Sequence, residues 1–119
     1  MAVGRALTKR AQYLAVYKSG KAWVNNLIVM RAFPNECEFT RYGFSVTKNV
    51  GKAVVRNRVK RLLKEISRTI PIRPGWDIVF ISRPEAAKAD YHKLRKSVEG
   101  LLYRADLIDR DEAICAGVN

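Results

Sequence analysis

Residues 52–69 constrain the fold more than any other part of the chain, because their sequence separates into two faces at helical spacing. Apolar side chains recur every three or four residues and would form one stripe along a helix: Val55, Val59, Leu62, Leu63 and Ile66. The opposite side would carry Lys and Arg residues with a single amide, Asn57. We therefore expect a helix of about 17 residues that buries one flank and presents a cationic one.

The density of charge on the cationic side favours a polyanionic partner. Between Lys48 and Arg68 there are eight Lys or Arg residues and one acid, Glu65. A charged helix that is merely solvated is usually stabilised by Lys–Glu pairs at i,i+4. In this segment only one Glu is available to pair with the eight cations, which disfavours that alternative. Binding to phosphates would relieve the repulsion among them. The candidate RNA-binding residues of this segment are Lys52, Arg56, Asn57, Arg58, Lys60, Arg61, Lys64 and Arg68.

The whole chain carries the same sign of charge, with a formal net charge of +12. This excess indicates either nucleic acid or an anionic membrane surface as partner. A membrane is the weaker alternative, since no apolar run approaches the roughly 18 residues of a spanning helix and no signal peptide is expected at the amino end. The apolar stripe also lacks the Trp or Phe of interfacial helices. Cys37 and Cys115 have no metal-ligand spacing and predict reduced thiols in a cytoplasmic protein.

The chain of 119 residues is expected to form one RNA-binding domain, 1–119, with an ordered core at about 5–105 and a frayed acidic tail at 106–119. The pattern predicts three helices. The first lies at about 8–18 with Thr8 as its cap, the second runs from after Gly51 to about residue 69, and the third lies at about 90–104. Strands are expected at 21–24, 27–33, from 37 or 38 to 48, and at 76–82. The third strand should return antiparallel to the second, and the last, an apolar run, should be covered on both faces. The fold class is therefore α+β, with one small mixed sheet, an amino-terminal helix, a basic crossover helix and a carboxyl-terminal helix.

Two further sets of residues attract attention. Tyr13 and Tyr17 lie four positions apart on one flank of the first helix, where they could pack in the core or stack on an unpaired base. The strand 41–48 alternates so that Gly43, Ser45 and Thr47 share one face. That face is either a plain exposed sheet surface or, between cations, the floor for an extended single strand.

Three segments resemble the protein subunits of bacterial ribonuclease P. They are Arg41-Tyr-Gly-Phe-Ser-Val-Thr-Lys48, then Val50-Gly51, then Lys52-Ala-Val-Val-Arg-Asn-Arg-Val-Lys-Arg-Leu-Leu-Lys-Glu65. The tripeptide 56–58 sits where that family has its RNR signature. Tyr13-x-x-Val16-Tyr17-x-x-Gly20 is similar to the family's first helix, and the segment 77–84 to its last strand. The resemblance covers about residues 5–105.

The resemblance implies that the basic helix binds the catalytic RNA subunit and that a cleft binds the single-stranded 5′ leader of precursor tRNA. The leader residues it implies are Tyr13, Tyr17, Arg41, Ser45, Thr47 and Lys48. It also implies a left-handed crossover between the strand ending near residue 48 and the strand beginning at 76. Asn49 and Lys64 depart from the family, which usually has Lys or Arg at the first position and often Arg at the second.

Nothing in the sequence predicts a protein nuclease site. A two-metal phosphodiesterase needs convergent carboxylates that hold ions about 3.5–4 Å apart, and the eleven acids are scattered. The lone His92 is expected to be exposed rather than catalytic. The resemblance implies an endoribonuclease whose RNA subunit carries the catalysis and the Mg²⁺, with one protein per RNA and no cofactor on the protein. The alternative is a general basic RNA-binding or ribosome-associated protein without a processing role; a DNA-binding regulator is disfavoured because no paired recognition helix is predicted.

Overall fold

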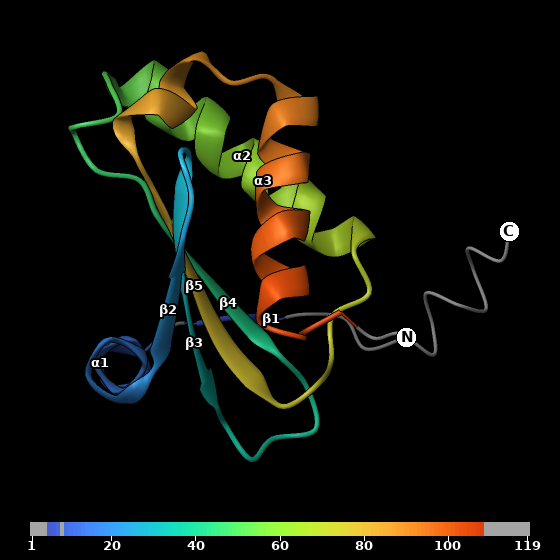
Figure 1. Cartoon of the computed structure of the whole chain (residues 1–119). Coiled ribbons are helices and arrows are strands. Elements are labelled where there is room, and N and C mark those ends of the chain that lie inside the picture. The colour runs from blue at the N-terminus through green and yellow to red at the C-terminus, as the bar shows by residue number, and fades with distance from the viewer. Residues whose placement is uncertain (1–4, 8, 109–119) are drawn as a thin grey trace, which may run out of the picture.

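The computed structural model describes residues 5–7 and 9–108, which form one sheet with helices on both faces (Figure 1). The strands are β1 (Arg5–Ala6), β2 (Lys21–Val24), β3 (Ile28–Pro34), β4 (Arg41–Ser45) and β5 (Trp76–Ser82). The helices are α1 (Arg10–Ser19), α2 (Ala53–Thr69) and α3 (Tyr91–Arg104), with a short 3₁₀ helix, η1 (Pro84–Lys88), between β5 and α3. The sequence pattern did not predict β1 or η1.

The sheet has the order β1-β4-β5-β3-β2. β4 pairs in parallel with β1 and β5, whereas β3 pairs antiparallel with β2 and β5. The sheet is thus mixed, which confirms the predicted α+β class. The β4–α2–β5 segment is a crossover between adjacent parallel strands. The left-handedness expected for this crossover stays a prediction.

β5 organises two hydrophobic clusters because its side chains alternate between the faces of the sheet. Ile78 and Phe80 are fully buried beneath α2 and α3, and Phe80 stacks on Phe44 with ring centroids 5.9 Å apart. Val79 points to the other face, where it packs with Leu7 and Val16 beneath α1. The expectation that this strand is covered on both faces is confirmed.

The apolar stripe of α2 packs against the larger cluster as predicted. Val59, Leu63 and Ile66 are at most 1% exposed, and Val55 and Leu62 pack at the edge of the same cluster. At about 25 cal/mol per Å² of buried apolar surface, each such side chain stabilises the fold by roughly 1.5–3 kcal/mol. The helix ends before Pro71, which lies one residue beyond its C-cap.

The strand expected from 37 or 38 to 48 is not a neighbour of the strand expected at 27–33, because β5 lies between them. They do run in opposite directions, since β3 is antiparallel and β4 parallel to β5. β4 is also shorter than expected at both ends. Its start is delayed because Asn35 organises an irregular turn, accepting from the Cys37 N–H at 2.7 Å and donating to the Phe39 carbonyl at 3.1 Å. Its end at Ser45 is followed by a turn in which the Val50 N–H donates to the Thr47 carbonyl.

The termini differ from expectation as well. Thr8, the predicted cap of the first helix, lies outside the described residues; α1 begins at Arg10, and Gln12 accepts a hydrogen bond from the Lys9 N–H at 3.1 Å. The ordered core continues beyond Ala105, since Leu107 is 1% exposed and Ile108 forms a β-bridge with Ile72. Residues 109–119 of the expected frayed tail lie outside the described part of the chain.

Gly100 offers a direct test of helix packing, because it lies exposed within α3 and a Cβ built there meets no atom within 4 Å. Gly100→Ala should stabilise the protein by about 0.5–1 kcal/mol through reduced entropy of the unfolded chain. Thermal denaturation should show a melting temperature raised by a few degrees. Gly20→Ala is the matched control and should lower it, because its Cβ would collide with the backbone oxygens of Val16 and Ala32. A lower melting temperature for Gly100→Ala would contradict the description of this face as open.

Candidate nucleic-acid interface

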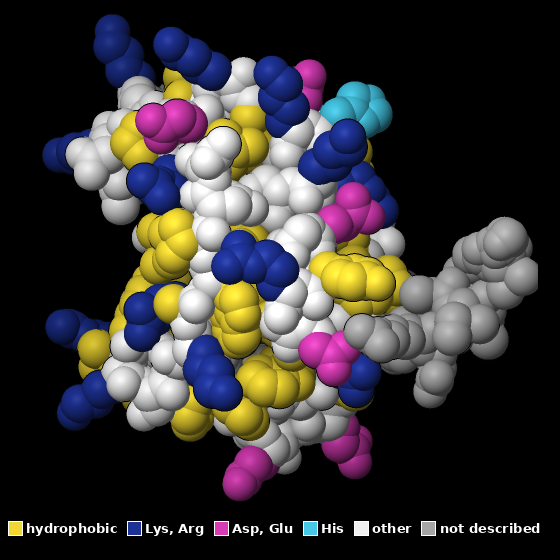
Figure 2. All heavy atoms as spheres, in the orientation of Figure 1, with side chains coloured by type: hydrophobic (Ala, Val, Ile, Leu, Met, Phe, Trp, Pro, Cys, Tyr) yellow, Lys and Arg dark blue, Asp and Glu magenta, His cyan; other side chains and the backbone are white. Residues whose placement is uncertain are grey.

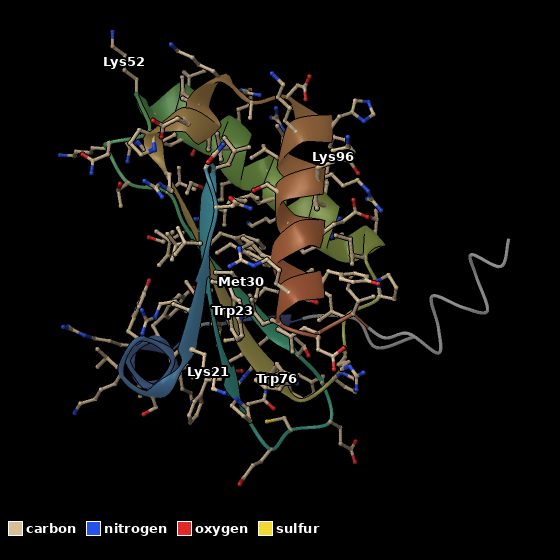
Figure 3. All side chains as sticks on the ribbon, in the orientation of Figure 1. Lys21, Trp23, Met30, Lys52, Trp76 and Lys96 are labelled. Carbon is tan, nitrogen blue, oxygen red and sulfur yellow. The ribbon has the colours of Figure 1, made fainter. Side chains whose placement is uncertain are left out.

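α2 exposes one acid, Glu65, and a set of polar side chains that we call its outward face. The outward face consists of Lys52 at the N-cap and of five side chains on the side of the helix opposite the apolar stripe: Asn57, Lys60, Arg61, Lys64 and Arg68. Lys52 stands at the amino-terminal end of the helix and projects away from the body of the molecule (Figure 3). Because all but one of these side chains are cations, the face can contact several phosphates along a nucleic-acid backbone.

The two arginines of the 56–58 tripeptide are not part of this fully exposed set. Arg56 is half-buried, and its Nε is buried without a hydrogen-bond partner. Arg58 is also half-buried, and its guanidinium donates to the carbonyls of Ala87 at 2.8 Å and Ala89 at 3.3 Å. The tripeptide therefore presents Asn57 outward while Arg58 is held by the end of η1.

The face of the sheet that α1 partly covers contains an open row of side chains. Register places Val24 opposite Val29, Val29 opposite Ile81, and Ile81 opposite Ser45, so four neighbouring strands contribute one residue each. Val24 is 45% exposed and the other three are half-buried. We call this row the cleft floor. It is apolar except at the Ser45 end.

Tyr13 forms part of the wall beside the cleft floor, and packing holds it in place. Its ring lies directly over Gly43, where an added Cβ would be 2.6 Å from the Tyr13 Cε1. Its hydroxyl donates to the Leu7 carbonyl at 3.3 Å, and its ring contacts the small cluster under α1. Burial, and to a smaller extent the neighbouring Tyr17, raises the pKa of Tyr13. Only Gly at position 43 leaves room for this ring.

Tyr17 is the more exposed of the two tyrosines, at 38%. Arg31 of β3 fixes it, because the Arg31 Nη2 donates to the Tyr17 carbonyl at 2.7 Å and the guanidinium carbon lies 5.9 Å from the ring centroid. A cation at this distance attracts the ring electrostatically. The Tyr17 ring is therefore oriented by the protein while much of it stays accessible to a base.

Arg41 is paired rather than free. Its Nε and Nη2 donate to the two carboxylate oxygens of Asp77, each at 2.7 Å, and Asn35 donates to the same carboxylate at 2.8 Å. The hydrogen bond to Asp77 raises the pKa of Arg41 above its ordinary value. An open pocket of about 450 Å³ lies between this pair and Ala11 and Ala15 of α1. The Arg41 charge is largely compensated by Asp77, which weakens it as a phosphate contact.

The cleft floor and the outward face of α2 are connected through the turn that follows β4. Thr47 and Lys48 are exposed in this turn, after Ser45 and before Lys52. Figure 2 shows a hollow at the left edge of the molecule, with hydrophobic side chains along it and Lys or Arg on the lobes above and below. An extended strand lying in the hollow would therefore reach the cations that precede α2.

Comparison with known proteins shows which family the chain belongs to. The family model described as Ribonuclease P matches residues 1–106. The chain belongs to the ribonuclease P protein family. Among its relatives, the Ribonuclease P protein component of Caldanaerobacter subterraneus subsp. tengcongensis is 44% identical over 108 residues, covering 89% of this chain and 93% of the relative. That of Dehalococcoides mccartyi strain 195 is 44% identical over 104 residues and covers 87% of each chain.

Solved structures of ribonuclease P proteins share the fold. The Staphylococcus aureus protein superposes with a TM-score of 0.78 at 29% identity, over 89% of this chain and 99% of that one. The Thermotoga maritima protein gives 0.74 at 32% identity, over 84% and 96%. Membership of this family makes the chain an RNA-binding part of an endoribonuclease complex that processes tRNA.

The cleft floor of this ribonuclease P protein was not predicted from its sequence. The apolar cleft floor at Val24, Val29 and Ile81 depends on the register of three strands, and the nearest signal was the alternation within each strand.

Among residues 5–7 and 9–108, no group of three or more His, Cys, Asp or Glu side chains is placed to hold a metal ion. None of the described helices is long and apolar enough to cross a membrane.

Proposed function

We propose that this protein binds the catalytic RNA subunit of ribonuclease P through the outward face of α2 and holds the 5′ leader of precursor tRNA on the cleft floor. The observation that supports this most is the continuity between the two surfaces. The cleft floor ends at Ser45, and the exposed Thr47, Lys48 and Lys52 follow it along the chain. A general RNA-binding protein would need the cationic helix but no adjoining cleft.

In this role, Tyr17 stacks on a leader base and Lys48 contacts a leader phosphate, while Ser45 and Thr47 offer hydroxyl groups to the strand. Tyr13 shapes the wall through its contact with Gly43. Arg41 contributes less charge than an unpaired Arg, because Asp77 neutralises it. The partners are one ribonuclease P RNA per protein and precursor tRNA, and the site of action is the cytoplasm.

Catalysis belongs in this proposal to the RNA subunit, which binds the Mg²⁺ that activates the attacking water. The part this protein plays is positional. Its cations neutralise phosphates of both RNAs where they approach each other, and its cleft orients the leader. Its contribution should consequently grow when Mg²⁺ is scarce and phosphate repulsion is poorly screened.

A cleavage assay tests the division of labour. Protein freed of RNA should not cleave precursor tRNA with Mg²⁺ or Mn²⁺, whereas a bacterial ribonuclease P RNA should cleave it faster with the protein than without it, most clearly at low Mg²⁺. The measurement is single-turnover cleavage across a Mg²⁺ series. Cleavage by the protein alone would place a catalytic site on the protein. Equal rates with and without the protein at every Mg²⁺ concentration would contradict the positional role.

A further inference from the structure

Arg58 turns away from the outward face of α2 and reaches the end of η1. Its Nη2 donates to the Ala87 and Ala89 carbonyls, and its Nη1 also donates to the Ala89 carbonyl at 3.4 Å. Carbonyls at the end of a short helix lack partners within that helix, so a guanidinium fork is well suited to bind them. Arg58 thereby ties α2 to a segment about thirty residues away in the sequence.

These hydrogen bonds fix the position of Lys88. This residue lies between the two residues whose carbonyls Arg58 binds, and it is exposed. On either side of it, Ala86 and Ala89 are 0% and 3% exposed and anchor the segment in the core. Figure 1 shows η1 beside the amino-terminal half of α2. The backbone that carries Lys88 is therefore held next to α2.

Counting Lys88 itself, the stretch 83–93 carries one net positive charge. Arg83 and Lys93 are exposed in the same stretch, together with two acids, Glu85 and Asp90. The Asp90 carboxylate accepts a hydrogen bond from the Lys93 N–H at 2.9 Å and caps α3. Neighbouring groups lower the pKa of Asp90, led by this hydrogen bond. The Lys88 side chain forms none of the ion pairs found among the described residues, so it is available to a phosphate.

We propose that the junction of η1 and α3, residues 83–93, extends the RNA-binding surface of α2, with Lys88 contacting a phosphate of the RNA subunit. Arg58 is then a positioning residue that holds Lys88 beside α2. The proposal rests on the RNA-binding role of α2 proposed above. It adds a contact outside the 52–68 segment and gives Arg58 a different task from its neighbours on the helix.

The first test measures binding of the full-length protein to a bacterial ribonuclease P RNA across a salt series. If Lys88 neutralises one phosphate, Lys88→Ala should weaken binding about eight-fold at 0.1 M salt and reduce the slope of log K against log salt by about 0.9. Lys60→Ala on α2 serves as the positive reference. Lys18→Ala, an exposed cation on α1 across the sheet, should leave both quantities unchanged. The melting temperature should stay the same in all three variants, because each side chain is exposed.

The second test asks whether Arg58 positions Lys88. Arg58→Lys keeps the charge but loses the fork that binds two carbonyls. In that background Lys88→Ala should cost about two-fold instead of about eight-fold, because Lys88 is no longer held in place. A purely structural role of Arg58 would lower the melting temperature without changing the cost of Lys88→Ala.

The outcomes separate this proposal from the proposed function. An unchanged salt slope in Lys88→Ala, with a reduced slope in Lys60→Ala, overturns the extended surface and leaves the role of α2 intact. Unchanged slopes in both variants overturn the role of α2 itself. Equal costs of Lys88→Ala in the two backgrounds overturn the positioning role of Arg58. Lys88→Ala decides the first question even if Arg58→Lys fails to fold.

Discussion

Replacing Lys60, Arg61 and Lys64 together by Ala should weaken binding to the ribonuclease P RNA about 500-fold at 0.1 M salt. If each cation neutralises one phosphate, the loss of three contacts reduces the slope of log K against log salt by about 2.7. All three side chains are exposed on the side of α2 opposite Val59 and Leu63. Folding should therefore survive, and the change can be assigned to the interface.

The matched control removes the same amount of charge elsewhere. Arg10, Lys18 and Lys21 are exposed on α1 and β2, away from the outward face of α2. Replacing these three by Ala lowers the net charge equally, so any effect of overall charge appears in both triple variants. Filter binding or fluorescence anisotropy across a salt series, with melting curves of each variant, makes the comparison. Equal losses in the two variants would mean that net charge, and not this helix face, attracts the RNA.

The local pattern of the sequence was sufficient where an element's own residues determine its burial. The apolar stripe of α2 and the continuous apolar run of β5 were both predicted with bounds close to those observed. In each case the spacing of hydrophobic side chains reports directly which face meets the core. The charge of the outward face of α2 could be anticipated for the same reason.

What the sequence could not supply is the pairing of distant segments. The strands 27–33 and 41–45 are close in sequence and look like a hairpin, but β5, more than thirty residues later, takes the place between them. Only the sheet order reveals that Val29, Ile81 and Ser45 form one row. The cleft floor is consequently a property of the register and not of any single strand.

Two candidate RNA-binding cations have guanidinium groups that are bound by residues distant in the sequence. Arg41 reads as a free cation at the start of a strand, yet it forms a bidentate pair with Asp77. Arg58 reads as part of the RNA-binding tripeptide, yet the carbonyls of Ala87 and Ala89 occupy its guanidinium. A helical projection gives the direction of a long side chain but not what that side chain meets. The exposed lysines needed no such correction, because their surroundings are solvent.

Tyr17→Ala should weaken the affinity of the holoenzyme for leader-bearing precursor tRNA by about 1–3 kcal/mol, the usual range for losing one base–aromatic stack. That loss corresponds to about 5-fold to 150-fold in Kd. Mature tRNA has no leader, so its affinity should barely change. Tyr17→Phe should behave like the unchanged protein, since stacking uses the ring and the Tyr17 hydroxyl donates no described hydrogen bond. The measurement is equilibrium binding of both tRNAs by each variant holoenzyme.

Tyr13 provides the internal comparison for this prediction, because it lies on the same helix and is more deeply packed. Its ring fills the space above Gly43 and contacts the cluster of Leu7, Val16 and Val79. Tyr13→Ala should therefore lower the melting temperature clearly, whereas Tyr17→Ala should lower it little, given the 38% exposure of Tyr17. If Tyr17→Ala instead destabilised the protein as much as Tyr13→Ala and weakened binding of both tRNAs equally, Tyr17 would be a packing residue and the leader would lie elsewhere. A loss confined to precursor tRNA, in a protein that melts normally, assigns Tyr17 to the leader.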